Sequence, residues 1–298
     1  MTRARRGGGR GCYCPAMLSI VKAGPYTIRG LSLGGIYTSL YVQELDAMLD
    51  VGLAPRQFAA ARNLFISHGH ADHIGAIGTL MGIRGLHRCP PPRMFVPAAI
   101  ADDIKDTLAA LAKMQRYDLA VHLVPMEPGD EQQLKGTMFV RAFRTHHPVP
   151  SLGYQFFRRT KKIKPEFADL PGQEISRLNA GGAPLFYEHE SAELAYATDT
   201  LLRVIDTHPS LLQTRVLILE CSFLDDKKDV AASRAGCHVH LDELLERADD
   251  FHNEALVLMH FSQLYDPRMV REILARRCPP QLLARIVPFL PQGDAWTV

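Results

Sequence analysis

Short apolar runs alternate with polar, Gly- and Pro-rich stretches along most of the chain. Tyr37–Val42 and residues 47–51 have the composition of β-strands, whereas residues 102–113 and 241–251 repeat their apolar positions with helical spacing. Turn residues punctuate these runs, as in CPPP at 89–92 and GGAP at 181–184. The pattern predicts an α/β protein. From Leu18 onward no low-complexity linker or fixed-period repeat divides the chain, so we expect one compact domain over residues 17–298.

Five of the apolar runs lead directly to a histidine or a carboxylate. They are residues 63–66 before His68, 138–143 before His146 and His147, 194–197 before Asp199, 216–219 before Glu220, and 255–259 before His260. Rigid strands that end in ligating or catalytic side chains are a common way for an α/β protein to build a site. The pattern therefore predicts one site at the ends of several strands.

The densest chemistry lies at residues 68–73, which read H-x-H-x-D-H after a predicted strand. Imidazole and carboxylate together suit zinc, manganese or iron. His68, His70, Asp72 and His73 cannot all bind one tetrahedral ion that also keeps a position open for water. The spacing therefore indicates two metal ions.

Composition narrows the class of protein without choosing a function. Of 298 residues, 47% are apolar and 22% charged, which is typical of a globular chain with a sizeable core. No apolar run approaches the roughly 18–20 residues that a membrane-spanning helix needs, so we expect no membrane association. The net charge of +2 indicates no whole-protein attraction to nucleic acid. Six cysteines without a C-x-x-C pair predict free thiols and a cytoplasmic location.

The first 16 residues are basic and Gly-rich, and no uninterrupted apolar segment with a cleavage site follows them. We expect a flexible basic tail at residues 1–16 rather than a targeting signal. An over-long reading frame with its true start at Met17 would give the same pattern.

These motifs together resemble the metallo-β-lactamase superfamily and, within it, the short form of ribonuclease Z, the tRNA 3′-processing endonuclease, most of all its plant-type members. Besides residues 68–73, the resemblance rests on 30–35 (GLSLGG), 65–68 (FISH), 72–75 (DHIG), 84–86 (RGL), His147 followed by Gly153 and Tyr154, 197–200 (ATDT), 220–226 (ECSFLDD), 236–240 (GCHVH) and 260–262 (HFS). It covers roughly residues 18–290. It implies a single-domain, four-layer αββα sandwich with a dinuclear zinc site.

The resemblance also implies the role of each ligand. It assigns His68, His70 and His147 to one zinc and Asp72, His73 and His260 to the other, with Asp199 bridging the two ions. Mn²⁺ or Fe²⁺ would suit the same donors. Between the adjacent histidines, the spacing to Gly153 and Tyr154 favours His147 over His146, which we expect to be a neighbour of the ligands or exposed.

The implied reaction is cleavage of precursor tRNA just 3′ of the discriminator base, which leaves a 3′-hydroxyl on the tRNA. Asp72 would orient the attacking water or accept its proton, and Glu220 and His238 resemble the family's acid pair, which would protonate the leaving oxygen. His240 is expected to support His238 or to be solvated. Family members are often homodimers. The alternative is a hydrolase of the same superfamily that acts on a small phosphodiester, lactone or thioester.

The family also has a protruding arm that grips tRNA away from the chemistry. The candidate here is residues 158 to about 185, whose start carries five basic side chains, Arg158, Arg159, Lys161, Lys162 and Lys164. They can neutralise phosphates, although a solvated basic hairpin would have the same sequence.

Two positions depart from the family pattern. Thr198 replaces the usual Gly before the bridging aspartate and places a side chain close to the metals. Cys221 replaces Ser in the usual E-S-T-F, and we expect it to be a small core residue rather than a nucleophile.

Overall fold

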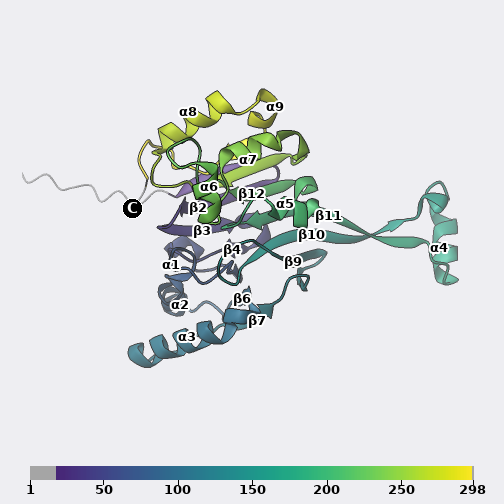
Figure 1. The fold of residues 1–298 in the computed structure, drawn as a ribbon. Coiled ribbons are helices and arrows are strands. Elements are labelled where there is room, and N and C mark those ends of the chain that lie inside the picture. Colours follow the sequence, from purple (N-terminus) through teal and green to yellow (C-terminus); the bar gives the residue numbers. More distant parts are fainter. Residues whose placement is uncertain (1–17, 297–298) are drawn as a thin grey trace, which may run out of the picture.

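The computed structural model describes residues 18–296, so the expected tail at 1–16 lies outside the described residues. Two seven-stranded sheets stack face to face within this range, with helices on both outer faces (Figure 1). The first sheet has the order β1 to β7, and the second the order β14 to β8. This is the four-layer αββα sandwich that the resemblance implied.

Each sheet is antiparallel at one edge and parallel at the other. β4 to β7 are parallel in the first sheet, and β11 to β14 are parallel in the second. The strands are β1 Ser19–Ala23, β2 Tyr26–Leu33, β3 Tyr37–Val42, β4 Ala47–Leu49, β5 Asn63–Phe65, β6 Arg93–Pro97, β7 His122–Met126, β8 Glu131–Lys135, β9 Met138–Arg144, β10 Leu152–Ile163, β11 Phe186–Ala197, β12 Val216–Glu220, β13 Ala255–Met259 and β14 Ile286–Pro288.

Most of the helices cover the outer faces of the sheets, and α4 lies apart from them between β10 and β11. They are α1 Ala71–Ile74, α2 Ile77–Leu86, α3 Ala101–Gln115, α4 Gly172–Ala180, α5 Val204–Thr207, α6 Val230–Ala235, α7 Leu241–Glu246, α8 Pro267–Arg277 and α9 Pro280–Leu283. α3 confirms the helix expected over 102–113. The helix expected over 241–251 was too long, because α7 ends at Glu246. There Arg247 leaves helical geometry, a short 3₁₀ turn follows at Ala248–Asp250, and the chain turns to bury Phe251 before β13.

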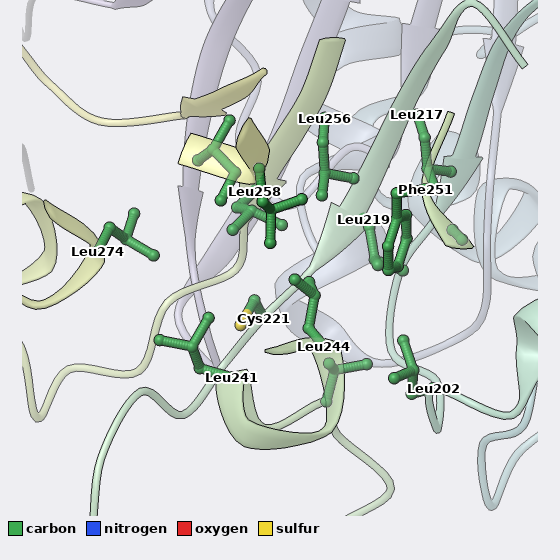
Figure 2. Close-up of a cluster of buried hydrophobic side chains, with 14 of the residues drawn as sticks. Leu202, Leu217, Leu219, Cys221, Leu241, Leu244, Phe251, Leu256, Leu258 and Leu274 are labelled. Carbon is green, nitrogen blue, oxygen red and sulfur yellow. The ribbon is translucent and has the colours of Figure 1, made fainter. Parts of the chain in front are cut away.

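Alternate residues of the central strands supply different layers of the core. On β12, Ile218 points into the space between the sheets, whereas Leu217 and Leu219 point outward to the helices. Figure 2 shows this outer cluster, in which α7 contributes Leu241 and Leu244. A strand that is buried on both faces must be apolar at consecutive positions, which explains the unbroken run VLIL.

A long arm projects from the edge of the sandwich (Figure 1). β10 and β11 continue beyond the sheet as an antiparallel pair, and α4 forms the tip. The expected segment, 158 to about 185, covers the outgoing strand and the tip. It omits the returning strand, which starts at Phe186.

Two further expectations can be compared with the described residues. No helix within residues 18–296 combines the length and the apolar character that crossing a bilayer requires. The four cysteines in this range, Cys89, Cys221, Cys237 and Cys278, are all free thiols.

Candidate metal centre

The H-x-H-x-D-H segment is held at the end of β5 by close backbone packing. His68 follows the strand, His70 is the residue before α1, and Asp72 and His73 lie within α1. The segment after β4 packs directly under this helix, where the Val51 amide donates to the His73 carbonyl at 2.6 Å. A β-carbon on Gly52 would lie 1.9 Å from the carbonyl oxygen of Asp72. Only glycine therefore permits α1 to approach this closely.

One group of donors gathers His68, His70, His147 and Asp199, whose ligand atoms all lie within 4.8 Å of one another. His70 Nδ1 lies 3.1 Å from His68 Nε2 and 3.2 Å from His147 Nε2. The Asp199 Oδ2 atom lies 3.6 Å from His68 Nε2 and 3.9 Å from His147 Nε2. These residues come from the loop after β5, the loop after β9 and the end of β11.

A second group gathers Asp72, His73 and His260. His73 Nε2 lies 3.3 Å from His260 Nε2, and Asp72 Oδ2 lies 3.4 Å from His73 Nε2 and 3.7 Å from His260 Nε2. The other oxygen of Asp199, Oδ1, lies 3.4 Å from His73 Nε2 and 3.3 Å from His260 Nε2. The two oxygens of Asp199 thus face different groups, as a bridging carboxylate requires.

The donor geometry fits metal ions. Bonds of about 2.0–2.1 Å in a tetrahedral zinc site place neighbouring ligand atoms roughly 3.3 Å apart, and the nitrogen pairs here are separated by 3.1–3.3 Å. Three carboxylates, Asp50, Asp72 and Asp199, also lie within 3.4 Å of the buried His73 ring. So much buried negative charge calls for a cation beside it.

The pKa directions of three ligands, His68, Asp72 and Asp199, match the protonation states that metal binding needs. His73 differs: burial would lower its pKa, but the charges of Asp199 and Asp50 raise it above its ordinary value. Burial and, to a smaller extent, the neighbouring His73 lower the pKa of His68 to about 2. Burial alone would raise the pKa of Asp72, but hydrogen bonds from His260 and His73 hold it well below its ordinary value. Burial opposes ionisation of Asp199 in the same way, and the surrounding histidines again lower its pKa. Neutral imidazole and ionised carboxylate are the forms that bind metal.

A buried network behind the ligands escaped the sequence analysis. Asp50 is fully buried, and its Oδ2 lies 2.7 Å from His73 Nδ1 and accepts from the Ser67 and Tyr196 hydroxyls at 2.7 and 2.6 Å. Ser67 Oγ in turn lies 2.9 Å from His68 Nδ1. Such partners fix the orientation of ligating rings. The available signal was an aspartate directly after the apolar residues Ala47–Leu49, the pattern that singled out the other site residues.

Glu220 and His238 meet beside the second donor group. Glu220 is fully buried at the end of β12, where its Oε1 lies 3.0 Å from His238 Nδ1 and accepts from the Thr200 amide at 2.9 Å. Its Oε2 accepts from the Ser222 hydroxyl at 2.7 Å. Burial lowers the pKa of His238, but the charge and hydrogen bond of Glu220 outweigh burial and raise it to about 9. His238 stacks on His260, with ring centroids 5.4 Å apart.

Several residues at the site have positive φ angles, which the sequence did not predict and which orient their side chains. Asp199 has φ +47°, Cys237 has φ +58° and His260 has φ +60°. Non-glycine residues seldom adopt this left-handed region, and they persist in it where the surrounding structure imposes it. With Asp50, which has φ +57°, four such residues lie at or beside the donors and mark this edge of the sandwich as specialised.

His146 and His240, the histidines that lie close in sequence to His147 and His238, do not belong to the two donor groups. His146 lies apart from both donor groups, and its Nε2 is 3.2 Å from the Thr207 hydroxyl. The expectation for His240 was wrong, because its buried ring accepts from the Asp242 amide and caps α7. The first turn of a helix needs acceptors for its free amides, and the His240 ring is one of them. The ring therefore neither supports His238 nor is solvated.

Thr198 and Cys221, the two departures from the family pattern, have different surroundings. The Thr198 hydroxyl donates to Asp199 Oδ1 at 3.0 Å, so the extra side chain touches the bridging carboxylate. Cys221 is fully buried in the apolar cluster beneath α7 (Figure 2).

On the arm, the returning strand neutralises part of the predicted basic segment. Directly paired residues on antiparallel strands share a face; Arg159 pairs with Glu190, and Lys161 pairs with Glu188. Arg159 Nη2 lies 2.5 Å from Glu190 Oε1 and 2.7 Å from Glu131 Oε2. Of the five basic side chains that could neutralise phosphates, Arg159 is therefore already paired with carboxylates. Arg158, Lys162 and Lys164 occupy the alternate positions, where Lys162 lies opposite Tyr187, and Arg158 is 3.5 Å from Glu193.

Comparison with known proteins supports the architecture. A model of the β-lactamase superfamily domain matches residues 38–261. Among solved structures, the metallo-β-lactamase fold protein YhfI of Bacillus subtilis superposes with a TM-score of 0.57 at 15% identity, covering 94% of this chain and 96% of that one. The short form of human tRNase Z superposes with a TM-score of 0.54 at 14% identity, covering 94% of this chain and 95% of that one. At these identities the likeness concerns the fold.

Sequence relatives are more specific. The chain is 32% identical over 257 residues to tRNase Z TRZ1 of Arabidopsis thaliana, which covers 86% of this chain and 92% of the relative. It is also 32% identical over 266 residues to tRNase Z TRZ2, chloroplastic, of the same plant, covering 89% and 75%. With a superfamily domain over most of its length and two relatives that are 32% identical and matched over 75% and 92% of their lengths, the chain belongs to the tRNase Z (ribonuclease Z) family of the β-lactamase superfamily.

Proposed function

We propose that this protein is a zinc-dependent endoribonuclease that removes 3′ trailers from precursor tRNA. The observation that carries the proposal is the bridging arrangement of Asp199 between two donor groups, in a chain whose matched relatives are named tRNase Z. His68, His70 and His147 would hold one ion, and Asp72, His73 and His260 the other. Mn²⁺ or Fe²⁺ would suit the same donors.

Two divalent cations held by these residues would lower the pKa of a water molecule and neutralise charge on a phosphodiester. Asp72 is the side chain positioned to accept the proton of the attacking water, because it is ionised and lies at the edge of the second group. In-line displacement at phosphorus then breaks the bond to the 3′-oxygen of the discriminator nucleotide. That oxygen leaves as an alkoxide unless it receives a proton.

His238 would donate this proton. Its raised pKa keeps it protonated at neutral pH, and Glu220 occupies Nδ1, which leaves Nε2 to face the substrate. The carboxylate also stabilises the charged ring until the proton is transferred. The products are a tRNA with a 3′-hydroxyl and a trailer with a 5′-phosphate.

The arm would grip the tRNA away from the metal centre chiefly through Lys162 and Lys164, because glutamates lie beside both Arg158 and Arg159. We further propose a homodimer and a cytoplasmic location. The support for the location is the free state of the four described cysteines, since disulfides are rare in reducing compartments.

The decisive experiment is incubation of the purified protein with a precursor tRNA that carries a 3′ trailer, followed by mapping of the cut. We expect a single cut just 3′ of the discriminator base, and no cut by the Asp72→Ala variant. Intact precursor, together with hydrolysis of bis(p-nitrophenyl) phosphate, would instead favour a hydrolase of small phosphodiesters.

A further inference from the structure

One basic side chain lies at the rim of the metal centre outside the roles assigned so far. Lys228 lies between Phe223 and the start of α6, in the segment that connects Glu220 to His238. Its ammonium nitrogen is 4.1 Å from the centroid of the Phe223 ring, a cation–π contact. The other neighbour of this ring is His238, with ring centroids 6.1 Å apart in an edge-to-face arrangement.

The backbone of Gly236 shows how close Lys228 comes to the proposed proton donor. A β-carbon placed on Gly236 would be 3.4 Å from His238 Cδ2 and 3.7 Å from Lys228 Nζ. Both side chains therefore border the same small volume. The Phe223 ring, only 7% exposed, gives the lysine a fixed platform on one side of it.

The positive charge of Lys228 is not paired with a carboxylate of the described residues. Within residues 18–296 the lysine makes no ion pair, although carboxylates lie nearby in sequence. Asp225 accepts from the Tyr265 hydroxyl at 2.9 Å and from the Lys227 amide at 3.1 Å, and Asp229 caps α6 by accepting from the Ala232 amide at 2.7 Å. A cation held in place without a counter-ion, beside the proposed proton donor, is suited to bind an anionic part of a substrate.

We propose that Lys228 binds the tRNA phosphate immediately 5′ of the discriminator nucleotide. This inference rests on the proposed function. His238 protonates the 3′-oxygen of the discriminator nucleotide, so the side of the site next to His238 receives the tRNA and not the trailer. The next phosphate on that side is the one 5′ of the discriminator. Lys228 thereby fixes the position of the last tRNA nucleotide relative to the cut.

The test uses the metal-loaded protein and a synthetic acceptor minihelix that ends at the discriminator base, so that binding is measured without cleavage. A second minihelix carries a neutral methylphosphonate in place of the phosphate 5′ of the discriminator. We expect wild type to bind the neutral form about 5- to 20-fold more weakly, as loss of one charge-assisted contact predicts. Lys228→Ala should bind both forms equally, at the weaker level, with a log–log salt slope smaller by about one.

Lys227→Ala is the matched control, because the neighbouring lysine is held by the Leu264 carbonyl and the Tyr265 ring, facing away from this volume. It should behave as wild type, and Lys228→Arg should keep most of the discrimination between the two minihelices. If Lys228→Ala still discriminates as strongly as wild type, the lysine does not contact this phosphate and the inference is overturned. Failure of wild type to bind either minihelix would overturn the proposed function itself.

Discussion

The metal centre and the arm both carry charged residues that the sequence singled out, but the two regions gather those residues in opposite ways. The centre collects side chains from positions as far apart as His73 and His260, whose Nε2 atoms lie 3.3 Å apart in the buried end of the sandwich. The arm presents near neighbours in sequence along one strand, largely open to water. In the centre residue type predicted the association correctly. On the arm, residue type did not predict which basic side chains are available, because their availability depends on the residues of the neighbouring strand.

The physical difference is the cost of an unpaired charge. A buried carboxylate or imidazole must find a partner or a metal ion, so the four buried donors, His68, His73, Asp199 and His260, leave few alternative arrangements. A surface lysine or arginine is solvated wherever it points and is worth little as an ion pair. The sequence around such a residue therefore does not reveal which partner it will have in the folded protein.

The largest expected effect follows from replacing Asp199 by Ala. Because its two oxygens face different donor groups, the variant should lose both ions together and all phosphodiester cleavage. Elemental analysis should show a fall from about two metal ions per chain to nearly none. Retention of one ion at wild-type affinity would mean that Asp199 serves a single group and that the centre is less integrated than its geometry indicates.

Replacing His238 by Ala should reduce cleavage of precursor tRNA by about 10²- to 10⁴-fold, the usual contribution of a general acid. Metal content should be unchanged, since the donor groups remain complete. An activated aryl phosphodiester, whose leaving group needs no proton, should lose much less, and kinetics with both substrates would test this. Comparable losses with both would exclude His238 as the proton donor.

Asp50→Asn tests whether the buried network tunes the centre. The amide keeps the size of the side chain but removes the charge that faces His73 Nδ1 at 2.7 Å. Metal affinity, measured by competition with a chelator, should fall by about 10- to 100-fold. Thermal unfolding of the metal-free variant provides the control. If affinity is unchanged while stability falls, Asp50 supports the fold and not the ligands.

The smallest effects are expected on the arm, where two double variants divide the basic residues by face. Lys162→Ala with Lys164→Ala should weaken precursor tRNA binding and flatten its log–log salt dependence by up to about two. Arg159→Ala with Lys161→Ala should leave that slope nearly unchanged, because the cross-strand glutamates face these two side chains. Binding measured over a salt series distinguishes them. Equal slopes for the two variants would show that the faces do not differ in their contact with RNA.

The sequence by itself determined the layers and the donor set. Some of the apolar runs predicted strands with their observed bounds, as at Ala255–Met259, because a strand buried on both faces is continuously apolar. Tyr37–Val42 was also predicted with its observed bounds. The H-x-H-x-D-H segment and the residues after the later strands identified metal chemistry, because few other environments accept so many buried imidazoles and carboxylates.

Tertiary structure decided what depends on contacts between distant segments. Asp50 resembles any aspartate at the end of a strand until α1 places His73 on its carboxylate. In the sequence His240 is indistinguishable from a site histidine, but in the folded protein its ring caps α7. Arg159 resembles a phosphate ligand until β11 brings Glu190 beside it. In each case the side chain has more than one stable partner in principle, and only the packing of another element selects one of them.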